Sequence, residues 1–471
     1  MPWVIAFLEG LSTLAVEVIA IRLAVPVVGS SATLNGITLA IVLLALSAGY
    51  WRGGTLSARR DPHRLLTALS RNLLVAAALY GVLAFPWEAR LLEKTLDIGL
   101  AVPLAIGATA CLLYLVPVYL ASQTVPMLAE LTNTEGKAGK ASGRVLFFST
   151  LGSVVGGIVT PVWLFPSLGV QRTTYVVCAL LVVAGVAALG RSRIIAAATS
   201  AIVVLALLAA AHVLLAPKEQ GFAFDSAYQT FRIVEDENSQ GRAERVLLLG
   251  GDRASGVYAR NGETSFSYVR EAEKALTETR AADILVIGAA GFTFPRDAAR
   301  LAWVRRIDAV DVDPAVKWIA EREFLKQPLD PKVHFFALSA RYALHRLRRE
   351  GRRYGLTLVD AYYGKSIPPE LLTQEFFADV AAISDHTVVN VIMDADLESN
   401  FAHSLLASFR GAFPKVWVKP LVVEDQDLNN VLVSDWQEEG SEAWNSQGRA
   451  YRDDLSSADR DWVRLAWGQS E

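Results

Sequence analysis

A glycine turn followed by an aspartate is the first feature of the sequence that could carry chemistry. The segment Gly288-Ala-Ala-Gly291 ends the apolar run 284–288, and Asp311 stands 23 residues beyond Gly288 at the end of the next apolar run. Such a turn lets a nucleoside approach the backbone, and a carboxylate about 20 residues further on binds the ribose hydroxyls. The spacing indicates a nucleoside site, with a packing glycine and a surface aspartate as the alternative.

A second carboxylate, Asp360, ends another apolar run. It follows 356–359 and precedes an aromatic and proline-rich segment that extends to Pro369. A carboxylate at the mouth of a crevice can bind an ammonium group or take its proton. A helix cap or a loop-ordering aspartate would explain the same residue equally well.

Alternating strands and helices are needed to bring these two carboxylates together. Parallel strands joined by helices make a doubly wound α/β sheet, whose ligand crevice lies at the carboxyl ends of the strands. The expected strands are 284–288, 306–311, 333–337, 356–360 and 387–393, with helices at 295–303 and 314–324 and an antiparallel pair at 415–423 and 430–434.

A smaller β unit is expected before this sheet. Two alternating segments, Phe224–Asp236 and Arg245–Tyr258, are typical of strands, and Gly250-Gly251-Asp252 is typical of a turn. The strand and helix patterns predict a β-hairpin subdomain over 217–281 and a Rossmann-like, nucleoside-binding type of domain over 282–471. The residues before them, 1–216, are predicted to form a helical transmembrane domain.

The first 216 residues have the composition of a membrane region. They carry a net charge of +6 and the remaining residues carry −9, which together give the −3 of the whole chain. Seven apolar stretches reach the length of about 20 residues that a bilayer requires. They are 3–25, 32–51, 65–86, 98–121, 144–166, 172–190 and 194–216.

The distribution of lysine and arginine predicts the orientation of these spans. The loops after spans two, four and six hold nine basic residues, whereas the loops after spans three and five hold three. Basic loops stay in the cytoplasm, so the N-terminus is expected there. Seven spans then place the acidic domain outside the cytoplasm, and a miscount at the short 190–193 break would reverse this.

Ionisable residues inside the first span form a candidate polar cluster. Glu9, Glu17 and Arg22 are costly in a bilayer and should face protein. The cluster is either a proton or amine path or a structural contact. Gly152, Gly156 and Gly157 in the fifth span are expected to permit close helix packing rather than to mark a conduit.

Other classes of function are disfavoured by composition. The two cysteines, Cys111 and Cys178, both lie in apolar runs. The soluble half has no basic stripe with interleaved aromatic residues, and its net charge of −9 argues against nucleic acid as a partner. No metal site is expected.

Taken together, these segments resemble a known group, bacterial membrane proteins in which a multi-span region is fused to a spermidine-synthase-like domain. The resemblance covers nearly the whole length. It rests on Glu17–Arg22, Gly49–Gly53, Ser149–Ser153, Tyr228-Gln229, Phe266–Tyr268, the Gly288 turn, Val310–Pro314 and Val359-Asp360.

The resemblance implies a polyamine aminopropyltransferase. That family moves an aminopropyl group from decarboxylated S-adenosylmethionine to the amine putrescine, making spermidine. By motif position, Gln229 and Tyr268 would contact the donor or the amine, and Asp311 would hold the ribose. Asp360 would deprotonate the attacking amine, since an ammonium cannot attack before it loses its proton.

Three positions depart from the family pattern. Gly291 stands where active members carry an aspartate that holds the amine of the donor, and Ser339 stands where an aspartate contacts the adenine. Tyr363 replaces a second carboxylate for the diamine, so Tyr362 and Tyr363 would face the substrate instead. Each lost charge-assisted contact typically costs about 1.5–3 kcal/mol.

Three functions therefore stay open. The first is a membrane-anchored aminopropyltransferase that acts on putrescine or another amine. The second is a pseudoenzyme that binds or scaffolds partner proteins of a membrane complex. The third is another user of S-adenosylmethionine, such as a methyltransferase. The retained Asp311 and Asp360 favour an enzyme, and the lost carboxylates favour the pseudoenzyme.

Overall fold

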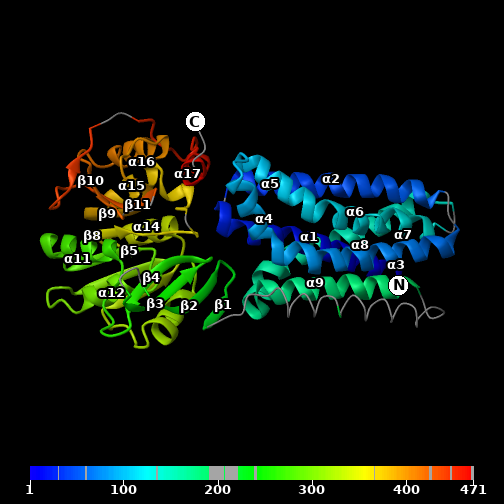
Figure 1. The fold of residues 1–471 in the computed structure, drawn as a ribbon, viewed down its shortest axis with the longest axis horizontal. Helices are drawn as coiled ribbons and strands as arrows, with labels where there is room; N and C mark the ends of the chain where they lie inside the picture. Colours follow the sequence, from blue (N-terminus) through cyan, green and yellow to red (C-terminus); the bar gives the residue numbers. More distant parts are fainter. Residues whose placement is uncertain are drawn as a thin grey trace. The chain divides into compact units, whose positions relative to one another are not determined.

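The computed structural model divides the chain into two compact units (Figure 1). One comprises Met1–Val28 and Ala32–Lys218, and the other comprises Gly29–Ser31 and Glu219–Glu471. The domain boundaries at 216 and 281 stay predictions. The residues that the structure describes are 1–29, 31–58, 61–133, 136–189, 206, 221–237, 241–364, 366–423, 427–445 and 448–467.

The first unit consists of helices and short connecting segments in its described residues. Its α-helices are α1 (Pro2–Val28), α2 (Ala32–Ser57), α3 (Pro62–Leu79), α4 (Phe85–Asp97), α5 (Val102–Ala110), α6 (Val116–Ser122), α7 (Thr124–Thr132), α8 (Ala138–Val159) and α9 (Phe165–Leu189). Three π-helical turns connect some of them: η1 (Tyr80–Ala84), η2 (Cys111–Leu115) and η3 (Thr160–Leu164).

Within the described residues, five helical stretches are long and apolar enough to cross a membrane. They are Pro2–Val28, Ala32–Ser57, Pro62–Val82, Val102–Thr132 and Ala138–Leu189. The first four predicted spans fall in separate stretches. The predicted spans 144–166 and 172–190 both fall in the fifth, and the predicted span 194–216 lies outside the described residues except for residue 206. The number seven therefore stays a prediction.

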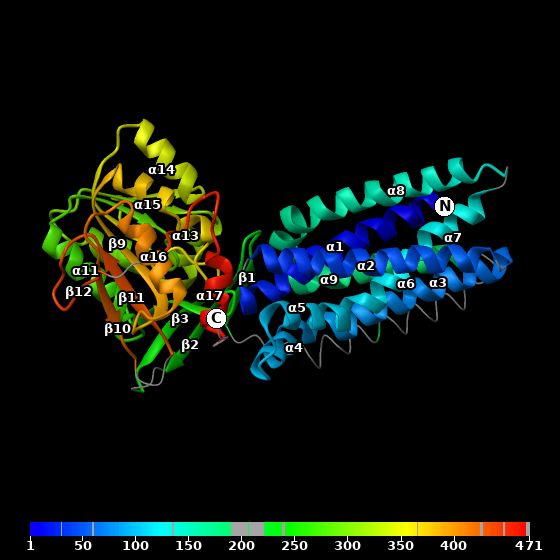
Figure 2. The same cartoon turned by 90° about the horizontal axis from the view of Figure 1, so that it is seen from above.

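The fifth stretch is too long for a single crossing. Its 52 residues would extend about 78 Å as one helix, against a hydrocarbon core of about 30 Å. The backbone leaves the helical region at Gly169, where φ is 79° and ψ is 164°. Figure 2 shows α8 and α9 as separate rods along α1, as expected if this stretch holds two of the predicted spans.

Close contact between α1 and α8 depends on glycine. A Cβ atom added at Gly10 would lie 1.9 Å from the Ser149 carbonyl oxygen, and one at Gly152 would lie 2.0 Å from that of Phe7. At Gly156 the distance to the Leu11 oxygen would be 2.3 Å. The predicted role of Gly152 and Gly156 in close helix packing is confirmed, because any larger residue would force the two backbones apart.

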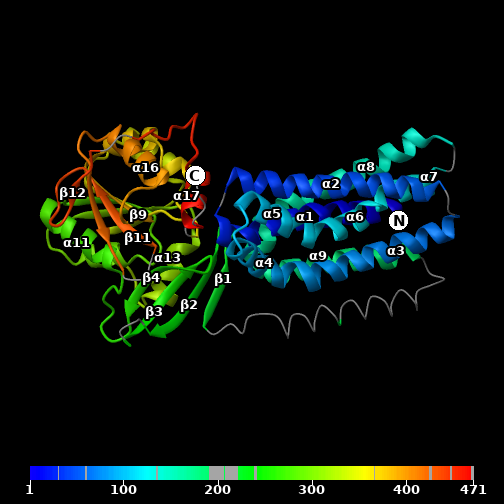
Figure 3. The same cartoon turned by 45° about the horizontal axis from the view of Figure 1, so that its top comes forward.

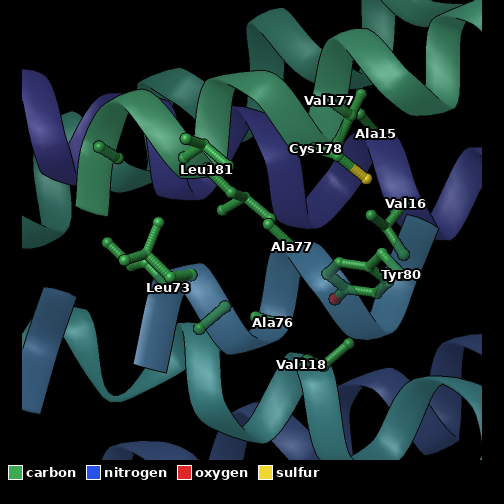
Figure 4. Close-up of a cluster of buried hydrophobic side chains, with 14 of the residues drawn as sticks. Ala15, Val16, Leu73, Ala76, Ala77, Tyr80, Val118, Val177, Cys178 and Leu181 are labelled. Atoms are coloured by element: carbon green, nitrogen blue, oxygen red, sulfur yellow. The ribbon is translucent and has the colours of Figure 1, made fainter. Parts of the chain in front are cut away.

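Apolar side chains fill the space between the helices (Figure 4). Alanine and valine from α1, leucine and alanine from α3, Val118 from α6 and Cys178 from α9 meet there with Tyr80 of η1. Cys178 is fully buried, which agrees with its place in an apolar run.

The second unit begins with a four-stranded antiparallel sheet rather than one hairpin (Figure 3). Its strands are β1 (Phe222–Asp225), β2 (Thr230–Glu237), β3 (Ala243–Leu249) and β4 (Asp252–Tyr258), paired in that order. A tight turn splits the first predicted strand, because the Ser226 hydroxyl accepts hydrogen bonds from the backbone N–H groups of Tyr228 and Gln229. Side-chain bonds of this kind compete with strand pairing.

An eight-stranded mixed sheet follows, in the order β12-β10-β11-β9-β8-β5-β6-β7. The parallel strands are β5 (Asp283–Ile287), β6 (Arg306–Asp311), β7 (Val333–Ala337), β8 (Tyr354–Val359) and β9 (Ser384–Asp394). The antiparallel strands are β10 (Trp417–Leu421), β11 (Leu428–Ser434) and β12 (Glu442–Ala443). The predicted doubly wound sheet and its antiparallel pair are confirmed.

Helices cover both faces of this sheet. In Figure 1, α11 (Ser267–Thr279) and α12 (Thr293–Ala299) lie on one side, and α15 (Gln374–Ala381) and α16 (Asn400–Arg410) lie on the other. The remaining elements are α13 (Ala315–Ile319), η5 (Ala320–Phe324), α14 (Ala340–Arg349), η6 (Pro369–Leu371) and α17 (Ala458–Ala466). The helix predicted at 295–303 is shorter, since it ends at Ala299.

Candidate functional site

The carboxyl ends of three neighbouring strands bring the predicted residues together. β5 lies between β6 and β8 in the sheet, and Gly288, Asp311 and Asp360 stand at the ends of these three strands. The chain continues from β5 to β6 on one side of β5 and later returns to β8 on its other side. Such a switch point is where open α/β sheets bind ligands. The sequence predicted this meeting point correctly.

Gly288 lets the first turn pass directly against the Asp360 backbone. Its φ is 89°, a region that favours glycine. A Cβ atom there would lie 2.2 Å from the Asp360 carbonyl oxygen and 2.6 Å from the Cα of Ala361. The glycine therefore sets the separation between the turn after β5 and the carboxylate after β8.

Asp311 is held by backbone amides at the end of β6. Its Oδ2 accepts from the N–H of Ala289 at 3.2 Å, and its Oδ1 accepts from the N–H of Asp313 at 3.0 Å. Burial raises the pKa of this half-buried carboxyl to about 6, against the opposing effect of these hydrogen bonds. The backbone N–H of Ala290 also interacts with this carboxylate. A carboxylate offers about four lone-pair sites, so acceptor capacity remains for a ribose hydroxyl.

Replacing Asp311 with alanine should weaken binding of an adenine nucleoside donor by about 1.5–3 kcal/mol, the usual value of a lost charged hydrogen bond. Titration calorimetry of the full chain with decarboxylated S-adenosylmethionine measures this. Asp311→Asn is the matched control for shape, and unchanged affinity in Asp311→Ala would remove the residue from the site.

Asp360 has a defined partner on each carboxylate oxygen. The Tyr268 hydroxyl donates to Oδ2 at 2.8 Å, and the Asn390 side-chain amide donates to Oδ1 at 2.9 Å. Burial raises the pKa of Asp360 to about 7, although both hydrogen bonds act in the opposite direction. The carboxylate is therefore oriented and able to exchange a proton near neutral pH.

Asn390 is a site residue that the sequence reasoning missed. It lies in β9, where the surrounding residues are valine and isoleucine, and it is buried. Its side-chain oxygen has no hydrogen-bond partner among the described residues. An asparagine inside an otherwise apolar central strand was the signal, because a buried amide needs polar partners.

Gln229 lies on the turn between β1 and β2 and is tied to the loop after β6. Its N–H and that of Tyr228 bond to the Ser226 hydroxyl, which donates to Asp313. Gln229 is buried, and its side-chain oxygen has no partner in the described part of the chain. Asp313, also missed from the sequence, thus fixes the small sheet beside Asp311.

Tyr362 and Tyr363 both use their hydroxyls within the protein. The Tyr362 hydroxyl donates to the Asn390 carbonyl oxygen at 3.0 Å and accepts from the N–H of Ile392 at 2.9 Å. The Tyr363 hydroxyl donates to the carbonyl oxygen of Tyr228. Their predicted contact with substrate would therefore use the ring faces, and it stays a prediction.

The two other departures differ in their surroundings. A Cβ atom at Gly291 would lie 2.5 Å from the Phe324 ring and 2.6 Å from the Cβ of Ser255, so this backbone leaves no room for a carboxylate. The Gly291 N–H donates to the Ser255 hydroxyl at 3.0 Å. Ser339 is exposed before α14 and makes no side-chain cap.

A cavity of about 350 Å³ in this unit does not coincide with the crevice. Gly221, β2 and Lys326 contribute to its lining. Its charged side chains pair with each other, Arg245 with Glu235 at 2.8 Å and Lys326 with Glu323 at 3.2 Å. We place the candidate site at the strand ends instead, because the oriented carboxylates are there.

The predicted polar cluster of the first span has a structural partner on α8. Glu9 is buried and accepts from Thr13 at 3.2 Å and from Ser149 at 3.0 Å. Glu17 and Arg22 are half-buried, with the Arg22 guanidinium 6.0 Å from the Phe165 ring centre. These contacts favour the structural explanation over a path, and the role stays untested.

A second buried carboxylate in the helices was not predicted. Glu88 of α4 is buried and accepts a hydrogen bond from the Tyr114 hydroxyl of η2. The signal was a glutamate beside an apolar block.

Among the described residues, no group of three or more histidine, cysteine, aspartate or glutamate side chains could hold a metal ion.

Comparison with known proteins finds a curated relative over part of the chain. No family model matches the chain. Over 152 residues it is 32% identical to the polyamine aminopropyltransferase of Vibrio vulnificus, covering 32% of this chain and 49% of that protein. The chain is spermidine-synthase-like in this segment. This chain spans about half the length of that relative. The activity and substrates of the relative are therefore proposals for this chain.

Solved structures of low sequence identity are also similar to this chain. A probable spermidine synthase from Corynebacterium glutamicum has 17% identity and a TM-score of 0.42, over 50% of this chain and 98% of that one. A spermidine synthase in complex with the transition-state analogue AdoDATO has 15% identity and a TM-score of 0.38, over 53% and 88%. The Thermotoga maritima spermidine synthase has 16% identity and a TM-score of 0.36, over 53% of this chain and 87% of that one.

Proposed function

We propose that the second unit is an aminopropyltransferase-type domain in which Asp360 is the general base. The observation that carries this proposal is the half-buried carboxylate at the end of β8, oriented by Tyr268 and Asn390 and with a pKa of about 7. Such a group is ionised in a large fraction of molecules at neutral pH and still holds a proton well enough to accept one.

The proposed reaction consists of one nucleophilic substitution at carbon and one proton transfer. The nitrogen of the acceptor amine, once neutral, attacks the carbon beside the positive sulfur of decarboxylated S-adenosylmethionine. The new C–N bond forms as the C–S bond breaks, the electron pair goes to sulfur, and a thioether leaves. Asp360 takes the proton from nitrogen, and Asp311 holds the ribose at the turn that Gly288 shapes.

The full chain is incubated with decarboxylated S-adenosylmethionine and a panel of amines, and release of methylthioadenosine is followed by chromatography. Release that depends on both the amine and Asp360 supports the proposal. Donor binding without release with any amine would contradict it and favour the second candidate below.

Putrescine should be a poor acceptor compared with a monoamine that carries an apolar tail. Tyr363 stands where the family places a carboxylate for the distal ammonium, and an aromatic face returns only about 0.5–2 kcal/mol by cation–π attraction. We expect the ratio of kcat/KM to favour the monoamine. Restoring the charge by Tyr363→Asp is the matched test, and saturation by micromolar putrescine in the parent would contradict this prediction.

A non-catalytic binding subunit is the second candidate, and one observation favours it. The space beside Gly291 is filled by Ser255 and Phe324, so an aspartate cannot be restored there without repacking. A subunit that had lost the reaction would still keep the crevice for a ligand or a partner protein of a membrane complex. Equal partner binding by the parent and Asp360→Asn would distinguish this candidate.

We also propose that the first unit is inserted in a membrane, the bacterial inner membrane being the expected location. Large apolar side chains are exposed along its helices, among them Leu43, Leu112, Phe147 and Ile158, while Glu9 and Ser149 face the interior. Soluble proteins show the opposite distribution. Lipid tails would cover the exposed apolar surface.

A C-terminal reporter should place the second unit outside the cytoplasm. The basic loops predict this, because their bias sets orientation regardless of a long terminal domain. An alkaline phosphatase fusion should be active and a green fluorescent protein fusion dark. A bright, phosphatase-negative pair would reverse the topology and put the domain beside the cytoplasmic pool of donor.

A further inference from the structure

Five arginines gather at the end of α14 and in the turn that follows it. This arginine patch consists of Arg346, Arg348, Arg349, Arg352 and Arg353. Among the described residues, two carboxylates pair with it: Glu350 lies 2.8 Å from Arg346 and 3.9 Å from Arg352, and Asp385 lies 2.9 Å from Arg353. The patch therefore keeps a positive charge, although residues 217–471 carry −9 overall.

The stability of α14 explains only part of this charge. Arginines in the last turn of a helix interact favourably with the helix dipole, which accounts for Arg346, Arg348 and Arg349. Arg352 and Arg353 lie beyond the helix, before the first residue of β8. They stand at the amino edge of the parallel sheet, opposite the crevice, so the crevice residues do not use them.

The exposed face of α14 is suited to a flat anionic surface. Tyr342, His345, Arg346 and Arg349 follow one another at helical spacing and all are exposed, while Ala343 and Leu347 on the other face are buried. Tyrosine and arginine side chains are favoured where a protein meets lipid headgroups. With its apolar face buried in the domain, the helix can lie against headgroups but cannot insert.

We propose that the arginine patch binds the anionic headgroups of a phospholipid bilayer. The inference rests on the proposed membrane insertion of the first unit, which holds the second unit close to lipid and so raises its effective concentration there. Basic residues near an anionic bilayer surface act additively, and each one typically increases association severalfold. The attraction extends about one Debye length and weakens with salt.

The test uses the full chain in nanodiscs, with a fluorophore on His345→Cys and lipids that carry a quenching nitroxide on the headgroup. Discs of neutral phosphatidylcholine are compared with discs that contain about one third anionic phosphatidylglycerol. The parent protein, which lacks the added cysteine, is treated with the same fluorophore. Its signal measures the background from labelling of Cys111 and Cys178. Quenching should be stronger in anionic discs and should fall to the neutral level at about 1 M salt.

Charge reversal identifies the residues. The double variant Arg346→Glu, Arg349→Glu should lower the anion-dependent association about tenfold or more, whereas Arg260→Glu, an exposed arginine after β4, should not change it. Equal quenching in both kinds of disc, as an acidic protein or RNA partner would predict, overturns the proposal. Failure to enter neutral discs would instead overturn the membrane insertion, and with it the inference.

Discussion

Replacing Asp360 with asparagine should lower turnover of the aminopropyl transfer by about 10²–10⁴-fold, the usual contribution of a general base. Asparagine keeps the shape of the side chain and can still meet the Tyr268 hydroxyl, but it takes no proton. KM for the donor should change little, because Asp311 rather than Asp360 is expected to hold the nucleoside. Single-turnover kinetics with a saturating amine measure the effect on the chemical step.

The pH dependence provides an independent measure of the same group. The base works when ionised, so kcat/KM should rise as pH increases through about 7, the pKa that burial gives Asp360. The Tyr268 hydrogen bond favours the ionised form. Tyr268→Phe should therefore move the rise to higher pH, and an Asp360→Asn enzyme that kept both full activity and the profile would exclude this carboxylate as the base.

Replacing Gly288 with alanine should produce a large loss of stability in the second unit. The new Cβ would lie 2.2 Å from a backbone oxygen at a φ of 89°. A left-handed φ costs a non-glycine residue about 1–2 kcal/mol, and overpacking typically adds about 1–3 kcal/mol. We expect the free energy of unfolding to fall by about 2–5 kcal/mol and the turn to move away from Asp360.

Gly262→Ala is the matched control for Gly288→Ala. Gly262 has a φ of 72°, but a Cβ there would meet nothing within 4 Å, so this variant carries the strain without the clash. Urea unfolding of the full chain in detergent compares the two. Equal losses would mean that strain alone acts at Gly288 and that the turn does not depend on contact with Asp360.

The sequence by itself determined the division into a helical unit and an α/β unit, and the edge at which the site lies. Apolar blocks of bilayer length and short alternating runs are local patterns, and local patterns set the type of each element. Parallel strands with crossover helices must bring their carboxyl ends to one edge. Gly288, Asp311 and Asp360 could therefore be placed together before any contact was known.

Only the tertiary structure decided what surrounds those residues. Tyr268 and Asn390 stand 92 and 30 residues from Asp360 in sequence, and no local pattern pairs them with it. The space beside Gly291 depends on Ser255, 36 residues earlier, and the partner of Glu88 depends on how η2 packs. Such contacts follow from the packing of whole elements, whose register and separation are set by side chains far apart in the chain.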